Sequence, residues 1–339
     1  MSGRQSAPAV RIERVPRLGE VLGQDHVLSM LRQGLERRTL HHALLFVGPE
    51  GVGKRTTALA LAARLFCASP REDDACGDCA ACVQVAAGSH PDLRRESFAV
   101  DDRGQPRESM VIDQVRGVQL FLGAQALAGG RKVAILEEAH ALTEDAQNAL
   151  LKTLEEPPRG SLILLVCHNA SRLAATVRSR CQRVAFSPLG RRTIETLLAA
   201  RLGVAAQDAR LGSLYAEGGL AFACEPARLR EAHEHASRLL AAGGPRSYVD
   251  VAAAAKDVLS TPRGVPLELK LLLQLLRRRL RARAGVEETD LTPPGKTGTL
   301  LDALRDVEAT YAAVVDLGRN ANRRLAAERL WLRIGERID

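Results

Sequence analysis

A glycine-rich turn carries the residues whose types and spacing most clearly suit a chemical task. The turn Gly48-Pro49-Glu50-Gly51-Val52-Gly53-Lys54 follows the apolar run 43–47 and precedes a stretch, 56–66, with helical residue preferences. A strand, the pattern G-x-x-x-x-G-K and a helix form a P-loop, whose backbone N–H groups surround phosphate oxygens while the lysine reaches the β- and γ-phosphates. We expect Gly48, Gly51, Gly53 and Lys54 to hold the phosphates of a nucleotide.

The residue after the P-loop lysine departs from this pattern. A Ser or Thr hydroxyl normally binds Mg²⁺ there, but this chain has Arg55, and Thr56 comes one residue late. Because a helix turns about 100° per residue, Thr56 points in another direction. We expect Arg55 and Thr56 to border a nucleotide site whose shape is kept and whose metal side is damaged.

Two carboxylates follow a second apolar run. Residues 132–138 predict an apolar strand that ends in Glu137 and Glu138. In P-loop ATPases the first carboxylate at this place holds Mg²⁺ and the second orients the attacking water. Glu137 stands where Asp is usual, and its additional methylene group displaces the carboxylate. Glu138 would be the vestigial base, although both residues could instead simply end a buried strand.

Asn169 follows another apolar run, 161–166, and is a further candidate for the site. A polar side chain at the end of such a strand can contact a γ-phosphate. The alternative interpretation is a turn residue, a common role of asparagine.

Four cysteines lie within sixteen residues, at Cys67, Cys76, Cys79 and Cys82. Four thiolates can surround one tetrahedral Zn²⁺ at about 2.3 Å each, and a site closed by four cysteines is structural. The alternative, that these cysteines share a loop by chance, fits poorly because the residues between them are mostly polar. The other cysteines, Cys167, Cys181 and Cys224, are far apart, and we expect them to be buried small residues.

Composition sets broader limits on the function. With 339 residues, 46% of them hydrophobic, the chain has material for two or three domains. A net charge of +8 suits contact with nucleic acid or an acidic partner. The arginines of 277–283 are a candidate DNA contact, but we favour a solvated helix face. No apolar segment resembles a signal peptide or a membrane span, so we expect a cytoplasmic protein.

The order of the predicted elements divides the chain into two parts. Strands at 43–47, after 93, at 132–138, 161–166 and 183–186 alternate with helices at 25–40, 56–66, 112–122 and 143–154. After Ser187-Pro188 the periodicity is helical throughout, at 193–202, 208–216, 227–240, 248–259, 267–284 and 300–316. We therefore predict an α/β domain followed by helical domains.

Several motifs together resemble the bacterial DNA polymerase III clamp loader, a family built on AAA+ modules. They are the P-loop, the four-cysteine insertion directly after the P-loop helix, Glu137-Glu138, the run Leu151-Lys152-Thr153-Leu154-Glu155-Glu156-Pro157-Pro158 and the turn Ser179-Arg180-Cys181. The resemblance implies an AAA+ P-loop parallel-sheet domain at 1–187 with a zinc module at 67–82, a helical lid at 188–242 and an all-α collar at 243–339. It also implies a five-membered ring with delta and gamma/tau subunits, which loads the sliding clamp onto primed DNA.

Within that family, Arg55 and Glu137 favour the delta-prime type, whose own nucleotide site is often degenerate. The alternative is the gamma/tau type, which hydrolyses ATP. Binding of ATP and Mg²⁺ is then expected to be weak, and the chain's own ATPase activity weak or absent.

Two arginines have roles that the resemblance suggests. The match to the Ser-Arg-Cys motif implies that Arg180 is an arginine finger acting in trans on a neighbour's nucleotide; the alternative is an ion pair within its own domain. The stretch 217–226 departs from the family's sensor-arginine turn and leaves Arg228 as a substitute. A hypothesis of a different class is also open, namely that the chain is a zinc protein that binds nucleic acid directly.

Overall fold

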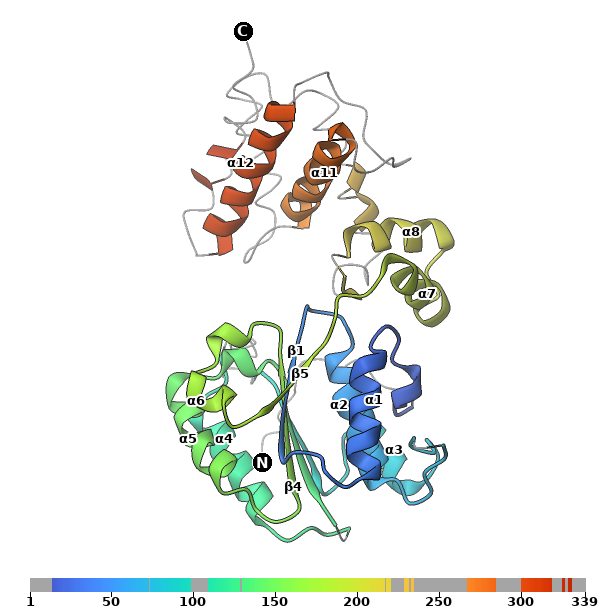
Figure 1. Cartoon of the computed structure of the whole chain (residues 1–339), viewed down its shortest axis with the longest axis vertical. Helices are drawn as coiled ribbons and strands as arrows, with labels where there is room; N and C mark the ends of the chain where they lie inside the picture. Colours follow the sequence, from blue (N-terminus) through green and yellow to red (C-terminus); the bar gives the residue numbers. More distant parts are fainter. Residues whose placement is uncertain are drawn as a thin grey trace, which may run out of the picture. The chain divides into compact units, whose positions relative to one another are not determined.

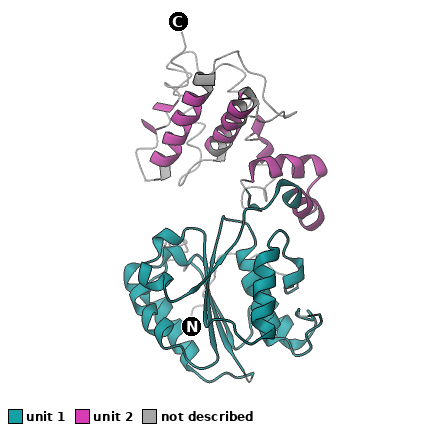
Figure 2. Ribbon diagram, viewed as in Figure 1, with its two compact units in different colours: residues 1–194, 218–221 teal, residues 195–217, 222–339 magenta. Residues whose placement is uncertain are grey.

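The computed structural model describes residues 14–72, 74–98, 109–128, 130–216, 218–220, 229–231, 233–234, 267–284, 300–318, 325–326 and 329–330. The chain divides into two compact units, residues 1–194 with 218–221 and residues 195–217 with 222–339 (Figure 2). The predicted boundaries at 187 and 242 stay predictions, because the division into two units does not separate a lid from a collar.

The first unit is built on a five-stranded parallel sheet. Its strands are β1 (Ala43–Val47), β2 (Leu93–Glu96), β3 (Lys132–Leu136), β4 (Ser161–Cys167) and β5 (Gln182–Ala185), in the order β2-β3-β4-β1-β5. Central β4 pairs with β1 and β3, so that Leu164 lies opposite both Leu44 and Ile135. All residues of β1 and β3 are buried, as expected for parallel strands that are covered on both faces. The predicted α/β class is confirmed.

Helices cover both faces of this sheet (Figure 1). One face carries α1 (Asp25–Glu36), α2 (Lys54–Phe66) and α3 (Ala80–Ala87), and the other carries α4 (Ile112–Gly123), α5 (Glu144–Glu155) and α6 (Ala175–Arg178). The described residues of this unit also form three short 3₁₀ helices, η1 (Leu18–Glu20), η2 (Ala139–Ala141) and η3 (Ala170–Arg172). Local sequence explains the start of α5, because the Thr143 hydroxyl caps it by accepting the Ala146 N–H at 3.3 Å.

The arrangement brings distant segments together at one edge of the sheet. Parallel strands all end at the same edge, so the loops after β1, β3 and β4 meet there. The loop after β1 is the P-loop, the residues after β3 are Glu137 and Glu138, and those after β4 are His168 and Asn169. The candidate nucleotide residues therefore share one end of the sheet.

The second unit contains only helices and turns among its described residues. They include α8 (Ala206–Tyr215), α11 (Leu267–Arg283) and α12 (Leu300–Gly318), while α7 (Arg191–Leu202) begins in the first unit. Helices α11 and α12 lie side by side, with Leu272, Leu276, Ala309 and Ala313 buried. None of the described helices is long and apolar enough to cross a membrane. The predicted helix 248–259, Arg228 and Cys224 lie outside the described residues.

Candidate functional site

The P-loop joins β1 to α2 in the conformation that its glycines permit. At Gly48 a Cβ atom would lie 2.5 Å from the Phe186 carbonyl oxygen, so a larger residue would push the loop away from the end of β5. Gly53 adopts a left-handed conformation, φ 98°, immediately before α2, a geometry that suits glycine. The Gly51 carbonyl accepts the N–H of Leu220 at 3.0 Å. The loop thus leads directly into the N-terminus of α2, the end of a helix that attracts anions.

Lys54 lies against this loop. Its ammonium group donates to the carbonyl oxygens of Gly48 at 2.7 Å and Pro49 at 2.5 Å. Its side chain is buried, and this burial lowers the pKa of Lys54, while the charge of Glu138 acts in the opposite direction. Its contact with the phosphates of a nucleotide stays a prediction.

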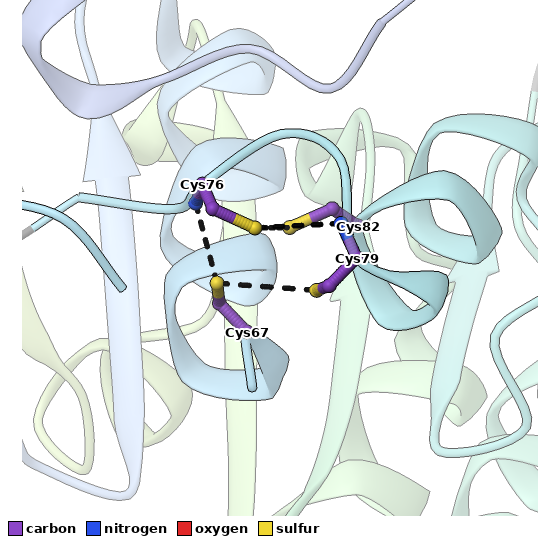
Figure 3. A group of neighbouring side chains, drawn as sticks. All are labelled: Cys67, Cys76, Cys79 and Cys82. Atoms are coloured by element: carbon purple, nitrogen blue, oxygen red, sulfur yellow. Dashed lines mark hydrogen bonds between the residues drawn. The ribbon is translucent and has the colours of Figure 1, made fainter. Parts of the chain in front are cut away.

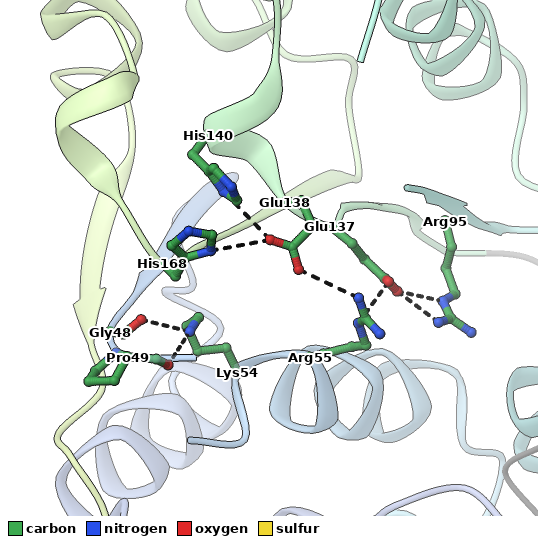
Figure 4. A network of polar contacts seen from close by, with 9 residues as sticks. All are labelled: Gly48, Pro49, Lys54, Arg55, Arg95, Glu137, Glu138, His140 and His168. Carbon is green, nitrogen blue, oxygen red and sulfur yellow. Dashed lines mark hydrogen bonds and ion pairs between the residues drawn. The ribbon is translucent and has the colours of Figure 1, made fainter. Parts of the chain in front are cut away.

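Arg55 extends to both carboxylates that follow β3 (Figure 4). Its Nε lies 2.8 Å from Glu137 Oε2, and its Nη2 lies 3.7 Å from Glu138 Oε1. The Glu137 side chain is only 4% exposed, and its other oxygen accepts two hydrogen bonds from Arg95, at 3.0 Å and 2.7 Å. A fixed guanidinium charge therefore lies between the two carboxylates, where the motif would place Mg²⁺.

The neighbouring hydroxyls do not replace the missing metal ligand. Thr56 is half-buried one residue further along α2. The Thr57 hydroxyl donates to the Gly53 carbonyl oxygen at 2.9 Å, which uses it within the helix. The damaged metal side stays a prediction, which the ion pairs of Arg55 with both carboxylates support.

Sequence reasoning missed Arg95. It lies on β2, opposite Ile135 of β3, so its side chain can reach the carboxylate that follows β3. Nothing in the local sequence pairs Arg95 with Glu137, because their contact depends on the pairing of two strands that are about forty residues apart.

Glu138 is held in a tight turn and faces two histidines. Its backbone is left-handed, φ 58° and ψ 42°, at the start of η2. Its Oε2 lies 3.4 Å from His168 Nδ1 and 3.6 Å from His140 Nδ1. Burial, with the nearby charges of His168 and Arg172, lowers the pKa of His140 to about 4.

Asn169 acts as a turn residue in this structure. Its Oδ1 accepts hydrogen bonds from the Ser171 N–H at 3.2 Å and the Ser171 hydroxyl at 2.6 Å, and it caps η3. Asn169 is exposed at the same sheet edge as the P-loop. Its contact with a γ-phosphate stays a prediction.

The four cysteines converge between α2 and α3 (Figure 3). Cys67 ends α2, Cys79 caps α3, and Cys82 lies in its first turn. The sulfurs of Cys76 and Cys82 are 3.9 Å apart and those of Cys67 and Cys79 are 4.0 Å apart. Four sulfurs at about 2.3 Å from a tetrahedral Zn²⁺ are separated by about 3.8 Å, so the donor set fits this ion. The helix α3, which the sequence did not predict, supplies two of the four positions.

The pKa values of the cysteines in this cluster shift in different directions. Burial tends to raise the pKa of Cys79, but hydrogen bonds from the Cys82 and Ala68 N–H groups and from neighbouring thiols lower it to about 6. Burial raises the pKa of Cys82. A bound cation would favour the thiolate of all four, since metal ligands must be deprotonated.

The cysteine loop is fastened to the segment around η1. Arg17 Nη2 donates to the Cys76 carbonyl oxygen at 2.5 Å. The Asp74 carboxylate accepts the N–H groups of Leu18 and Gly19 at 3.0 Å and 2.8 Å. These hydrogen bonds therefore connect the residues before α1, through the cysteine loop, to the end of the P-loop helix α2.

Arg180 lies between α6 and β5, with a partly exposed side chain. Its Nη2 lies 2.6 Å from Glu155 Oε1, and its Nη1 donates to the Thr176 carbonyl oxygen at 2.9 Å. The side chains of Arg180 and Glu155 are 36% and 49% exposed. The ion pair that the sequence offered as the alternative is thus present, although an exposed pair of this kind is weak.

The remaining candidates are two cysteines of the first unit and the arginine cluster on α11. Cys167 is buried at the end of β4, as expected, and Cys181 is half-buried. Arg281 of the arginine cluster is exposed on α11, as a solvated face requires, while the side chains of Arg278, Arg279 and Arg283 lie outside the described residues.

Comparison with known proteins identifies the α/β part of the chain. The family model described as "DNA polymerase III, delta subunit" matches residues 23–190, the segment that runs from the start of α1 to the end of the sheet. The DNA polymerase III subunit delta' of Pseudomonas aeruginosa is 45% identical over 140 residues, 41% of each chain. Over its α/β part, this chain is similar to DNA polymerase III delta-prime subunits.

Other relatives match over the same part of the chain. The delta' subunit of Escherichia coli is 36% identical over 179 residues, which cover 53% of this chain and 52% of that protein. The tau subunit of Bacillus subtilis is 35% identical over 176 residues, 52% of this chain and 30% of that protein. The chain thus spans about half or less of the length of these curated relatives.

Proposed function

We propose that the chain is a delta-prime-type subunit of the DNA polymerase III clamp loader. It would help to load the sliding clamp onto primed DNA, within a hetero-pentameric ring that also contains delta and gamma/tau subunits. The observation that carries this proposal is the position of Arg55 across Glu137 and Glu138. Such a substitution suits a ring member whose own nucleotide site is degenerate, and it argues against the gamma/tau type.

The chemistry of the substitution supports weak nucleotide binding without turnover. Mg²⁺ bridges the β- and γ-phosphate oxygens in octahedral geometry and neutralises the charge that develops between them. A guanidinium group carries one charge and donates hydrogen bonds, but it cannot coordinate phosphate oxygens as a metal ion does. Lys54 and the loop N–H groups can therefore still hold a phosphate, whereas Arg55 does not supply the metal's part in hydrolysis.

Zinc is the metal that we propose for Cys67, Cys76, Cys79 and Cys82. The sulfur separations fit tetrahedral thiolate coordination, and four cysteines leave no open position for a reaction. When bound, the ion would link α2, α3 and, through the Arg17 and Asp74 hydrogen bonds, the segment around η1. Its role would be to hold the P-loop helix in place.

Arg180 is the residue through which this subunit would act on chemistry. An arginine supplied by a neighbour stabilises the charge on the transferring phosphoryl group and is worth about 10³ to 10⁵ in rate. The Arg180–Glu155 pair is exposed, and such pairs contribute about 0–1 kcal/mol. A neighbour's γ-phosphate, with its higher charge, would therefore displace Glu155 readily. This role would be exercised in the cytoplasm, where the chromosome is replicated.

The test is the DNA-stimulated ATPase activity of the reconstituted ring. We expect Arg180→Ala to reduce turnover strongly, Arg180→Lys to reduce it as well because lysine lacks the planar fork of donors, and Lys54→Ala to leave it nearly unchanged. Glu155→Ala is the matched control, since it removes the ion pair and keeps the arginine. Equal losses in Arg180→Ala and Glu155→Ala, or full turnover by an intact Arg180→Ala ring, would contradict the finger role.

A further inference from the structure

Three side chains of types that can bind a metal meet beside the P-loop, and two of them, His140 and His168, have no role in the nucleotide site described above. Glu138 and His140 come from the turn after β3, and His168 directly follows β4. The two strands are neighbours in the parallel sheet, so these residues lie at the same edge. Figure 4 shows both imidazole rings directed at the Glu138 carboxylate, on the side away from Arg55.

From this geometry we infer that Glu138, His140 and His168 form a binding site for a transition-metal ion such as Zn²⁺. Each residue offers one donor atom, a carboxylate oxygen of Glu138 and a ring nitrogen of each histidine, and these atoms all lie within 4.8 Å of one another. The carboxylate oxygen is 3.4 Å from one nitrogen and 3.6 Å from the other. Ligand atoms at about 2.0–2.1 Å from a tetrahedral Zn²⁺ are separated by about 3.4 Å, so an ion fits with small adjustments.

The hydrogen bonding of these side chains leaves the donor atoms available. The His140 side chain is 7% exposed, and its Nδ1 has no hydrogen-bond partner among the described residues. Buried polar atoms are nearly always satisfied, so an unpaired ring nitrogen that faces a carboxylate indicates an absent ligand. The two Glu138 oxygens are divided between their neighbours, since Oε1 faces Arg55 and Oε2 faces the histidines.

The donor set indicates which class of ion would bind. Two imidazoles and one carboxylate suit Zn²⁺, Co²⁺, Ni²⁺ or Fe²⁺, whereas Mg²⁺ and Ca²⁺ prefer oxygen ligands. Three protein ligands leave a fourth position for water or another small ligand. The charge of Arg55 near Glu138 weakens the attraction for a second cation. The ion is therefore held less tightly than at the four cysteines and exchanges with solution.

A bound ion would also change what Glu138 can do. Its coordination occupies the Oε2 lone pairs that would otherwise orient a water molecule for attack. The metal site and the hydrolytic role of Glu138 are therefore mutually exclusive, whether or not the chain is a clamp-loader subunit.

The experiment is equilibrium dialysis of the full chain against Zn²⁺, after the cysteine cluster has been loaded and loosely bound metal removed. We expect a second, exchangeable equivalent of Zn²⁺. The variants His168→Ala and Glu138→Gln should each weaken the second equivalent by more than about 10-fold, the lower end of what losing even a supporting residue costs. His26→Ala, an exposed histidine on α1, is the matched control and should leave it unchanged.

A second measurement separates the two metal sites. Co²⁺ bound at the second site should absorb in the visible range without the thiolate charge-transfer band that Co²⁺ at the cysteines produces. His168 is exposed, so its replacement leaves the fold intact even if the buried His140 cannot be changed. Binding of one equivalent only, or a second equivalent that survives in His168→Ala, would overturn the inference.

Discussion

The two arginines on Glu137 should contribute unequally to stability, and they should partly substitute for each other. Arg95 donates two hydrogen bonds to one oxygen and is 27% exposed, whereas Arg55 forms an ion pair with the other oxygen at 2.8 Å and is 53% exposed. A hydrogen bond to a charged group contributes about 1.5–3 kcal/mol when buried, and less where water competes. We expect Arg95→Ala to lower the free energy of unfolding by about 2 kcal/mol and Arg55→Ala by about 1 kcal/mol.

The double variant should be worse than the sum of the two. With both arginines removed, the Glu137 carboxylate, which is 4% exposed, remains charged without a cationic partner. An uncompensated buried charge costs about 3–5 kcal/mol, so the coupling between the two substitutions is about 1 kcal/mol. The extra loss arises because either arginine alone keeps the carboxylate paired.

Amide hydrogen exchange in β3 and β4 measures these values locally, for example at Ile135 and Leu164. Each 1.4 kcal/mol lost should speed exchange about tenfold where the exchange rate follows the opening equilibrium. Arg159→Ala, an exposed residue in the loop before β4, is the control and should have little effect. Equal effects of Arg55→Ala and Arg95→Ala, or strictly additive effects, would refute the view that Glu137 is shared between them.

Further predictions concern other parts of the first unit. Stripping the metal from the cysteine cluster with a chelator should speed amide exchange over 67–88 and leave β1 and β4 protected; protection that is unchanged over 67–88 would contradict a structural ion. Gly219→Ala places a Cβ atom 1.8 Å from the Glu50 carbonyl oxygen. It should therefore break the hydrogen bond from the Leu220 N–H to the Gly51 carbonyl oxygen and speed exchange of the Leu220 amide. Continued protection of that amide would contradict this prediction. Burial raises the pKa of Cys181 to about 11, so its thiolate fraction at pH 8 is about 0.001 and alkylation by iodoacetamide should be far slower than for a free cysteine; rapid labelling of the folded chain would refute this burial.

The sequence predicted the central strands well, because buried parallel strands appear as short continuous apolar runs. The run 43–47 is β1 with the same bounds, and 161–166 differs from β4 by one residue. The position of the candidate site followed from the P-loop and from the carboxylates after β3, because parallel strands all end at the same edge of the sheet. The α/β class and the place of the candidate site were therefore predictable from local patterns.

Contacts between neighbouring strands were not predictable in the same way. Arg95 lies on β2, which reads Leu-Arg-Arg-Glu and shows little apolar pattern, and its partner Glu137 belongs to another strand. His140 and His168 were visible as single residues, but only the pairing of β3 with β4 places them around Glu138. Helix α3 was missed because its cysteines indicated a metal-binding loop, although two of them occupy the cap and first turn of a helix.

The central claim is that Arg55 takes the place of the metal and leaves this chain unable to turn over ATP by itself. Its most direct test is phosphate release by the purified chain with Mg-ATP, alongside Lys54→Ala to identify any contaminating ATPase. Enzymes commonly turn over at about 1 s⁻¹ or faster, and we predict that the isolated chain stays far below this rate and does not differ from Lys54→Ala. Turnover at about 1 s⁻¹ or above that disappears in Lys54→Ala would contradict the claim.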